Sequence, residues 1–213
     1  RAQEVILALK RLQRAGRLPR VPVFVDSPLT VRITDVFKLH PDCFDKEVFA
    51  MLRGGDSPFS FDGLRYVQSV EESMAVTADP RSAIIISASG MCEGGRVLHH
   101  LKSMLEHPRH TVLFVGFQAQ HTLGRRLVEQ RSEVRVFGMT LQRRAEVLSL
   151  QGFSAHADQA GLIDFAERAR DRGPLRRVIL VHGEPEGQEV LRRELLAREF
   201  PYVDVPAPGD RIR

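Results

Sequence analysis

Short apolar runs alternate with amphipathic stretches along most of the chain. The runs at residues 21–25, 83–86 and 112–115 are almost wholly apolar, as expected for parallel strands covered by helices on both faces of a sheet. The stretch after the second run carries apolar residues at helical spacing, namely Val97, Leu98, Leu101, Met104 and Leu105. This alternation predicts an α/β fold with a parallel sheet.

Helical spacing is present from the first residue onward. Val5, Leu9 and Leu12 lie on one face of a helix predicted over residues 1–14, because apolar residues three and four positions apart share a helix face. Since this helix is already under way at Arg1, we expect a further segment to precede it.

The C-terminal part of the chain shows a second strand and helix pattern. A strand predicted at residues 145–150 is followed by a helix with apolar positions between residues 162 and 169. Another predicted strand, at residues 178–181, precedes a helix with apolar positions from Val190 to Leu195. We therefore expect the chain to pass from one domain to another near residue 139.

Composition narrows the class of protein. The hydrophobic fraction of 43% and the charged fraction of 27% are close to the averages for soluble globular chains. The net charge of +4 gives a mild preference for anionic partners. Two distant cysteines, Cys43 and Cys92, exclude a disulfide framework and favour a reducing cytoplasm. No apolar stretch approaches the roughly 20 residues that span a bilayer, so no membrane partner is expected.

The ends of the apolar runs carry the first candidate chemistry, since ligands of open α/β sheets bind at such ends. A glycine-rich turn at residues 87–95 follows the second run. Its exposed amides could hold a phosphate, or the turn could be purely structural. The neighbouring Arg96, His99, His100 and Lys102 favour an anion. A polar loop at residues 116–126, which contains Gln118, is a second candidate anion surface.

Two histidines follow apparent strands in the C-terminal part. His156 stands in the segment Gly152-Phe153-Ser154-Ala155-His156-Ala157-Asp158, and His182 stands directly after the apolar run 178–181. A neutral imidazole can bind zinc or exchange a proton near neutral pH. Asp158 either caps the helix that follows or orients His156 through its second ring nitrogen, and capping is the favoured interpretation.

Five segments occur in the order typical of a known family. They are Asp26-Ser27-Pro28-Leu29, Ser87-Ala88-Ser89-Gly90-Met91, Val115-Gly116-Phe117-Gln118, Phe153-Ser154-Ala155-His156-Ala157-Asp158 and Leu180-Val181-His182-Gly183-Glu184. In these segments the chain resembles the β-CASP family of metallo-β-lactamase-fold RNA-processing nucleases. The resemblance covers essentially the whole chain.

The resemblance implies a division of the chain into two parts. Residues 1–139 resemble the β-CASP domain, a parallel sheet with helices on both faces. Residues 140–213 resemble the C-terminal segment of the metallo-β-lactamase domain, an αββα fold into which the β-CASP domain is inserted. This division agrees with the crossing expected from the strand and helix pattern.

The resemblance also assigns roles to individual residues. His156 matches the histidine that protonates the leaving oxygen, and His182 matches a zinc ligand. A histidine at the position of His182 is similar to the RNA-processing members of the family. The implied reaction is therefore the hydrolysis of single-stranded RNA with two zinc ions. The loops implied to hold RNA phosphates contain Ser87, Ser89, Gly90, Met91, Gly94, Gly95 and Gln118.

One departure from the family pattern is large. The His-x-His-x-Asp-His zinc motif of the family occurs at none of the eight histidines. One histidine ligand is too few for zinc, which usually has three or four protein ligands. We therefore expect the chain to be a fragment that lacks the N-terminal metallo-β-lactamase segment, that holds little or no zinc and that is inactive alone.

Alternative functions stay open at this level. An inactive RNA-binding β-CASP scaffold and a DNA-processing nuclease would share most of these segments. A nucleotide-binding Rossmann protein would share only the strand and helix alternation, and neither glycine fingerprint of that class is present. The sequence also allows a homodimer, and it does not distinguish internal cleavage from cleavage at an end.

Overall fold

The computed structural model describes residues 1–150, 152–153 and 156–211. The chain divides into two compact units, Arg1–Ser154 and Ala155–Arg213. Both units combine helices with mainly parallel strands, which confirms the predicted α/β fold class.

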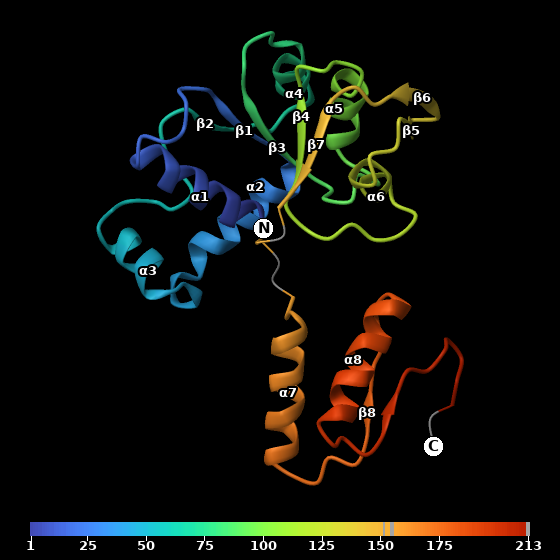
Figure 1. Ribbon diagram of the computed structural model, residues 1–213. Coiled ribbons are helices and arrows are strands. Elements are labelled where there is room, and N and C mark those ends of the chain that lie inside the picture. The colour runs from blue at the N-terminus through green and yellow to red at the C-terminus, as the bar shows by residue number, and fades with distance from the viewer. Residues whose placement is uncertain (151, 154–155, 212–213) are drawn as a thin grey trace. The chain divides into compact units, whose positions relative to one another are not determined.

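A three-stranded parallel sheet forms the centre of the first unit (Figure 1). Strand β1 (Val23–Asp26) lies between β2 (Leu64–Tyr66) and β3 (Ile84–Ser87). All four residues of β1 are buried, because both neighbours and both faces are covered. The continuous apolar run that predicted a central parallel strand is explained by this position.

Two further strand pairs complete the first unit. Strand β4 (Thr111–Phe114) pairs in parallel with β7 (Glu146–Ser149), and β5 (Glu133–Val136) forms a hairpin with β6 (Met139–Gln142). Residues Phe137 and Gly138 at the hairpin turn both have positive φ, 50° and 78°, as two-residue hairpin turns require. The sequence placed β7 at the start of the second pattern, but in space it pairs with β4 of the first unit.

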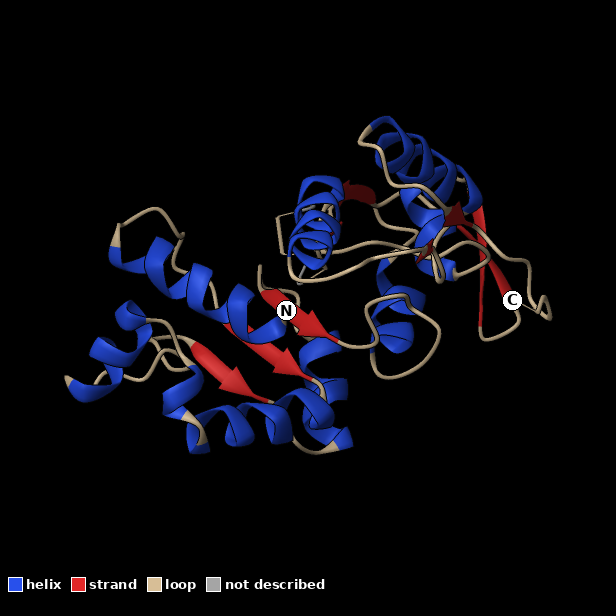
Figure 2. Cartoon of the chain, turned by 90° about the horizontal axis from the view of Figure 1, so that it is seen from below, coloured by secondary structure: helices blue, strands red, loops and turns tan. Residues whose placement is uncertain are grey.

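Helices lie on both sides of the three-stranded sheet (Figure 2). The helices of the first unit are α1 (Ala2–Arg14), α2 (Pro28–Leu39), α3 (Lys46–Arg53), α4 (Val70–Ala78), α5 (Val97–Met104) and α6 (Leu123–Val128), with a short 3-10 helix at Pro41–Cys43. Four of these helices begin at a side chain that accepts a backbone N–H, and these caps are Ser27, Asp45, Ser69 and Thr122. Such caps satisfy amides that the first helical turn leaves unpaired.

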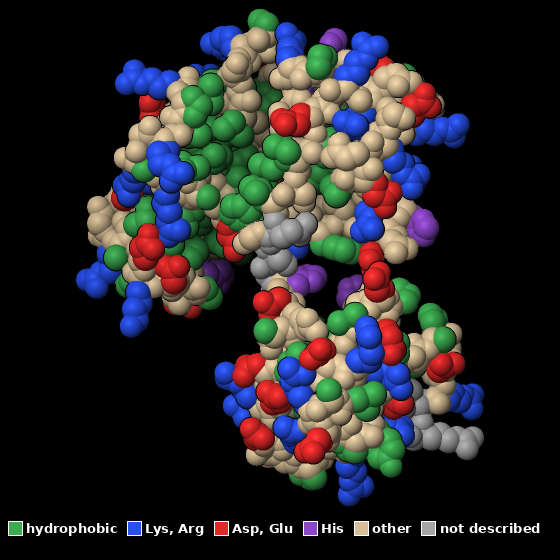
Figure 3. Space-filling view, viewed as in Figure 1, with side chains coloured by type: hydrophobic (Ala, Val, Ile, Leu, Met, Phe, Trp, Pro, Cys, Tyr) green, Lys and Arg blue, Asp and Glu red, His purple; other side chains and the backbone are tan. Residues whose placement is uncertain are grey.

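A hydrophobic core of the first unit lies between α5, α6, the β4–β7 pair and the β5–β6 hairpin. Leu105, Leu127 and Val136 are buried to within about 1% of their surface. Each buried side chain of this size contributes roughly 1.5–3 kcal/mol. On β4 and β7, the register partners Leu113 and Leu148 are about half exposed, and Figure 3 shows apolar side chains gathered on one face of this unit.

The second unit is a small α/β layer. It contains α7 (Gln159–Asp171), β8 (Val178–Ile179), α8 (Pro185–Ala197) and β9 (Val203–Asp204), with β8 and β9 parallel. Its core consists of Ile163, Ala166, Leu195, Phe200 and Val203. The predicted helices and strands of this part are present, although each strand has only two paired residues.

The spatial division of the chain lies fifteen positions beyond the crossing expected at residue 139, since β7 stays with the first unit. The family boundary at residue 139 therefore stays a prediction. Within the described part of the chain, no helix is long and apolar enough to cross a bilayer.

Candidate functional site

The first strand ends in a buried carboxylate. Asp26 has no exposed surface, and its Oδ1 accepts a hydrogen bond from Arg96 Nη1 at 2.6 Å. Its Oδ2 accepts from Ser73 Oγ at 2.5 Å and lies 2.7 Å from His100 Nε2. Burial raises the pKa of Asp26, but the hydrogen bonds from Ser73, Arg96 and His100 outweigh burial and hold the pKa below its usual value.

The groups around Asp26 connect three elements. Arg96 Nη2 donates to Gln68 O at 2.8 Å, and His100 Nδ1 lies 3.0 Å from Thr77 Oγ1. From the sequence alone, Arg96 and His100 are among the basic residues expected to favour an anion at the adjacent turn. That interpretation was wrong for these two residues, since both side chains face the carboxylate of Asp26. The signal available in the sequence was an aspartate ending a wholly apolar run.

The glycine-rich turn that follows β3 is held from inside. Ser87 Oγ donates to Asp26 O at 2.9 Å, and Ser89 N donates to Gly94 O at 3.1 Å. Ser89 Oγ accepts from Glu93 N at 3.3 Å. Gly95 has φ +83°, and a Cβ there would overlap the carbonyl of Ala88. The hydroxyls and Gly95 therefore shape the turn.

Several amides of this turn stay available for a ligand. Within the described residues, the backbone N–H groups of Gly90, Met91, Gly94 and Gly95 make no hydrogen bond. A side chain at Gly90 or Gly94 would meet nothing within 4 Å, so both positions face open space. Unpaired backbone amides in a turn can bind an anion, and this turn offers four of them among the described residues.

The polar loop 116–126 has a different geometry. Gln118 is only 6% exposed, and its Nε2 donates to Gly116 O at 3.0 Å. Its Oε1 is buried beside Gly124 and has no hydrogen-bond partner among the described residues. Gln118 thus faces the protein interior, and a contact with RNA phosphate stays a prediction that this conformation does not support.

The two candidate anion loops lie against each other. Gly124 N donates to Met91 O at 3.0 Å, and Leu123 N donates to Glu93 Oε1 at 2.5 Å. The carboxylate of Glu93 therefore accepts the hydrogen bond of the first backbone N–H of α6. The sequence missed this contact, because the two residues stand thirty positions apart.

His156 and His182 both stand in the second unit, three residues before α7 and α8 respectively. Both side chains are exposed, and His182 has φ 59°. Ser154 and Ala155 of the first histidine segment lie outside the described residues. Asp158 is the N-cap of α7 and accepts from Gly161 N at 2.8 Å. This contact is the capping role that the sequence favoured.

Helix packing relates the two histidine loops. Arg170 Nη1 donates to Arg198 O at 2.8 Å, and Arg198 Nε lies 3.7 Å from Glu167 Oε1. The C-terminal ends of α7 and α8 are thus neighbours, and the two helices run in the same direction (Figure 1). The loops that carry His156 and His182 therefore enter their helices from the same side of this unit.

A complete metal site is not present within the described residues, where no group of three or more His, Cys, Asp and Glu side chains is close enough to hold an ion. His182 offers an exposed imidazole, which suits zinc as one ligand. The donors of this part of the chain do not by themselves fit a whole zinc site.

Comparison with known proteins identifies both parts of the chain. The Beta-Casp domain family matches residues 2–127, and the family described as the Zn-dependent metallo-hydrolase RNA specificity domain matches residues 140–208. The chain belongs to the Beta-Casp family. The resemblance inferred from the five segments is thereby confirmed.

Relatives of this Beta-Casp chain include proteins named as ribonucleases and a transcription termination factor. It is 38% identical to a ribonuclease of Thermus thermophilus over 93% of the chain and 44% of that protein. It is 32% identical to transcription termination factor FttA of Methanosarcina mazei, over 86% of the chain and 29% of the factor. An RNase J-like protein of Methanocaldococcus jannaschii is 31% identical over 86% of the chain and 41% of its own length. The chain thus spans less than half of each relative.

Proposed function

We propose that the protein containing this chain hydrolyses phosphodiester bonds of single-stranded RNA with zinc. The observation that carries the proposal is the parallel packing of α7 and α8, which brings the loops of His156 and His182 to one side of a single unit. Membership of the Beta-Casp family and the ribonuclease among the relatives support the reaction class.

The two histidines take different roles in this proposal. His182 contributes one imidazole to the zinc ligands, and His156 protonates the oxygen that leaves the phosphate as the P–O bond breaks. When bound, zinc supplies an activated water and neutralises negative charge on the phosphate. The Asp158 carboxylate fixes the start of α7 two residues after His156, so it positions the loop through its helix cap.

The glycine-rich turn of the first unit supplies phosphate contacts to the RNA. The amides of Gly90, Met91, Gly94 and Gly95 have no hydrogen-bond partner within the described chain, and side chains at Gly90 and Gly94 would meet open space. Ser87 and Ser89 hold the turn in shape through their hydroxyls. Gln118 has a structural role in this proposal, because its buried side chain contacts Gly116 and Gly124.

The remaining zinc ligands come from a segment outside this chain in our proposal. The ribonuclease relative is more than twice as long as the matched region, and the described residues form no complete metal cluster. The chain alone is accordingly proposed to be inactive.

The exposed Cys43 and buried Cys92 are both free thiols, which fits the cytoplasm as the proposed compartment.

Zinc content and RNA cleavage test the two roles in the longer protein. We expect His182→Ala to lose bound zinc and cleavage together. We expect His156→Ala to keep its zinc and to cleave about 100-fold or more slowly, the usual contribution of a general acid. His40→Ala, which changes an exposed histidine of the first unit, is the matched control and should change neither quantity.

The readouts are metal analysis by mass spectrometry and cleavage of matched end-labelled RNA and DNA single strands. Full turnover in both His156→Ala and His182→Ala would refute the assigned roles. Faster cleavage of DNA than of RNA would refute the substrate, while binding of RNA without any cleavage by the wild type would establish a scaffold.

A further inference from the structure

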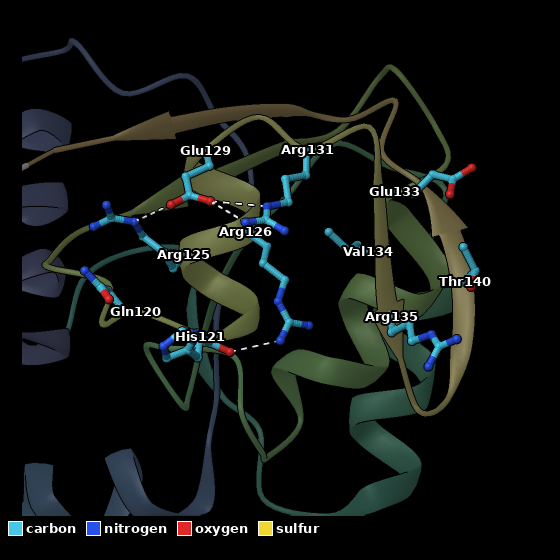
Figure 4. Close-up of a pocket in the computed structure, with 10 residues that line it drawn as sticks. All are labelled: Gln120, His121, Arg125, Arg126, Glu129, Arg131, Glu133, Val134, Arg135 and Thr140. Atoms are coloured by element: carbon cyan, nitrogen blue, oxygen red, sulfur yellow. Dashed lines mark hydrogen bonds and ion pairs between the residues drawn. The ribbon is translucent and has the colours of Figure 1, made fainter.

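An open groove lies between α6 and the β5–β6 hairpin of the first unit (Figure 4). Its volume is about 710 Å³. Four arginines and two glutamates line it, and these are Arg125, Arg126, Arg131, Arg135, Glu129 and Glu133. None of these residues belongs to the glycine-rich turn or to the histidine loops.

One carboxylate holds two of the arginines in place. Glu129 Oε1 accepts from Arg125 Nε at 2.8 Å, and Glu129 Oε2 accepts from Arg131 Nη2 at 3.1 Å. These hydrogen bonds lower the pKa of Glu129, so it is ionised at neutral pH. The Glu129 carboxylate thus bridges Arg125 and Arg131 on this side of the groove.

The other two arginines carry no such counter-charge. Arg126 lies between α6 and β5 in Figure 4, where its Nη2 donates to the carbonyl of His121 at 3.0 Å. Arg135 is exposed on β5, on the same face as Glu133, because Val134 and Val136 point into the core. Among the described residues, no carboxylate forms an ion pair with Arg126 or Arg135.

The chemistry of this groove fits phosphate groups joined in a chain. A guanidinium presents paired N–H donors that match two oxygens of a phosphate, and each arginine stays charged at any physiological pH. The lining contains no Phe, Tyr or Trp on which bases would stack. The groove is therefore suited to the nucleic-acid backbone and not to base recognition.

We propose that this arginine groove binds the phosphate backbone of single-stranded RNA, independently of base sequence. The choice of RNA rests on the proposed function, whereas the phosphate contacts rest on the groove itself. Arg126 and Arg135 make the principal contacts through their positive charge. Both contacting side chains come from elements outside the five family segments.

Salt-dependent binding of RNA by this 213-residue chain tests the proposal. The probe is a fluorescent oligouridine of about 15 nucleotides, which forms no duplex, and the readout is fluorescence anisotropy between about 50 and 200 mM salt. We expect the double variant Arg126→Ala and Arg135→Ala to bind about tenfold more weakly. The slope of log K against log salt should fall by about 1.4, because each single-strand phosphate contact contributes about 0.7.

Two further variants make the test specific. The control Arg53→Ala with Arg65→Ala removes the same charge from exposed positions on α3 and β2, and it should keep the wild-type slope. The pair Arg126→Lys and Arg135→Lys keeps the charge and should retain most of the binding. If the double alanine variant loses its fold by circular dichroism, the exposed single variant Arg135→Ala should still lower the slope by about 0.7.

Three results would contradict the proposal that this groove binds RNA. They are a double variant with the slope of the control pair, a wild-type chain that does not bind RNA at low salt, and displacement of the RNA by polyglutamate as efficiently as by unlabelled RNA. None of these results bears on zinc or cleavage in the longer protein. Conversely, a longer protein without nuclease activity would leave the groove proposal intact as long as the arginine variants weaken binding.

Discussion

Two strands of this protein lead into ionisable residues with opposite surroundings. Asp26 at the end of β1 is fully buried, and Ser73, Arg96 and His100 all contact its carboxylate. His182, three residues beyond β8, is exposed in a loop with a left-handed backbone. In the sequence both look like a polar residue after an apolar run. The helices around the strand decide whether such a residue holds the fold together or stays accessible for chemistry.

The largest effect should follow from removing the buried carboxylate. Asp26→Ala leaves Arg96 and His100 without their partner in the interior, and breaking a buried pair in this way costs about 3–5 kcal/mol. We expect that loss in urea unfolding of this chain, in the transition of the first unit. The control Asp35→Ala, whose exposed carboxylate pairs with Lys38 one helical turn away, should cost less than about 1 kcal/mol.

The stability that Asp26 contributes should depend on pH. The pKa of Asp26 is lowered in the folded protein, so its ionised form contributes stability that is complete above the unfolded pKa of about 3.9. That contribution is lost as pH falls through the lower folded pKa. We therefore expect the stability difference between wild type and Asp26→Asn to narrow only below about pH 4. A difference independent of pH from 6 to about 3 would contradict this.

A smaller effect is expected at the cap next to the first histidine loop. Asp158→Ala removes the acceptor for Gly161 N at the start of α7, and such cap losses cost about 1 kcal/mol. The loss should appear in the unfolding of the second unit only. Asp158→Ser, which keeps a capping oxygen, should recover most of it, and equal losses in both variants would show that the cap does not stabilise α7.

The smallest effect on stability should come from the exposed histidine. His182→Ala should change the free energy of unfolding by no more than about 0.5 kcal/mol, as is usual for exposed positions. His182→Gly should be equally stable or slightly more stable, because glycine adopts the positive φ at this position without strain. A loss above about 2 kcal/mol would place His182 with Asp26 as a residue that holds the fold together.

Several features could be predicted from the sequence because they depend on neighbours along the chain. Apolar runs predicted β1, β3 and β4, helical spacing predicted α1, α5 and α7, and the type of residue before α7 predicted its cap. The order of the five segments identified the family. Pairing was not predictable in this way, since β7 joins β4 across thirty-five positions.

The sequence by itself determined the presence of β1, β3, β4, α1, α5 and α7, and which of its loops carry glycines and histidines. Tertiary structure alone decided which charged residues those loops leave accessible. Arg96 pairs with Asp26, seventy positions away along the chain. Glu93 accepts a hydrogen bond from the first amide of α6, thirty positions away. Arg126 and Arg135 instead line an open groove. The physical reason is that a charge is satisfied by whichever opposite charge or dipole folding brings within hydrogen-bond distance, and local spacing along the chain does not encode that distance.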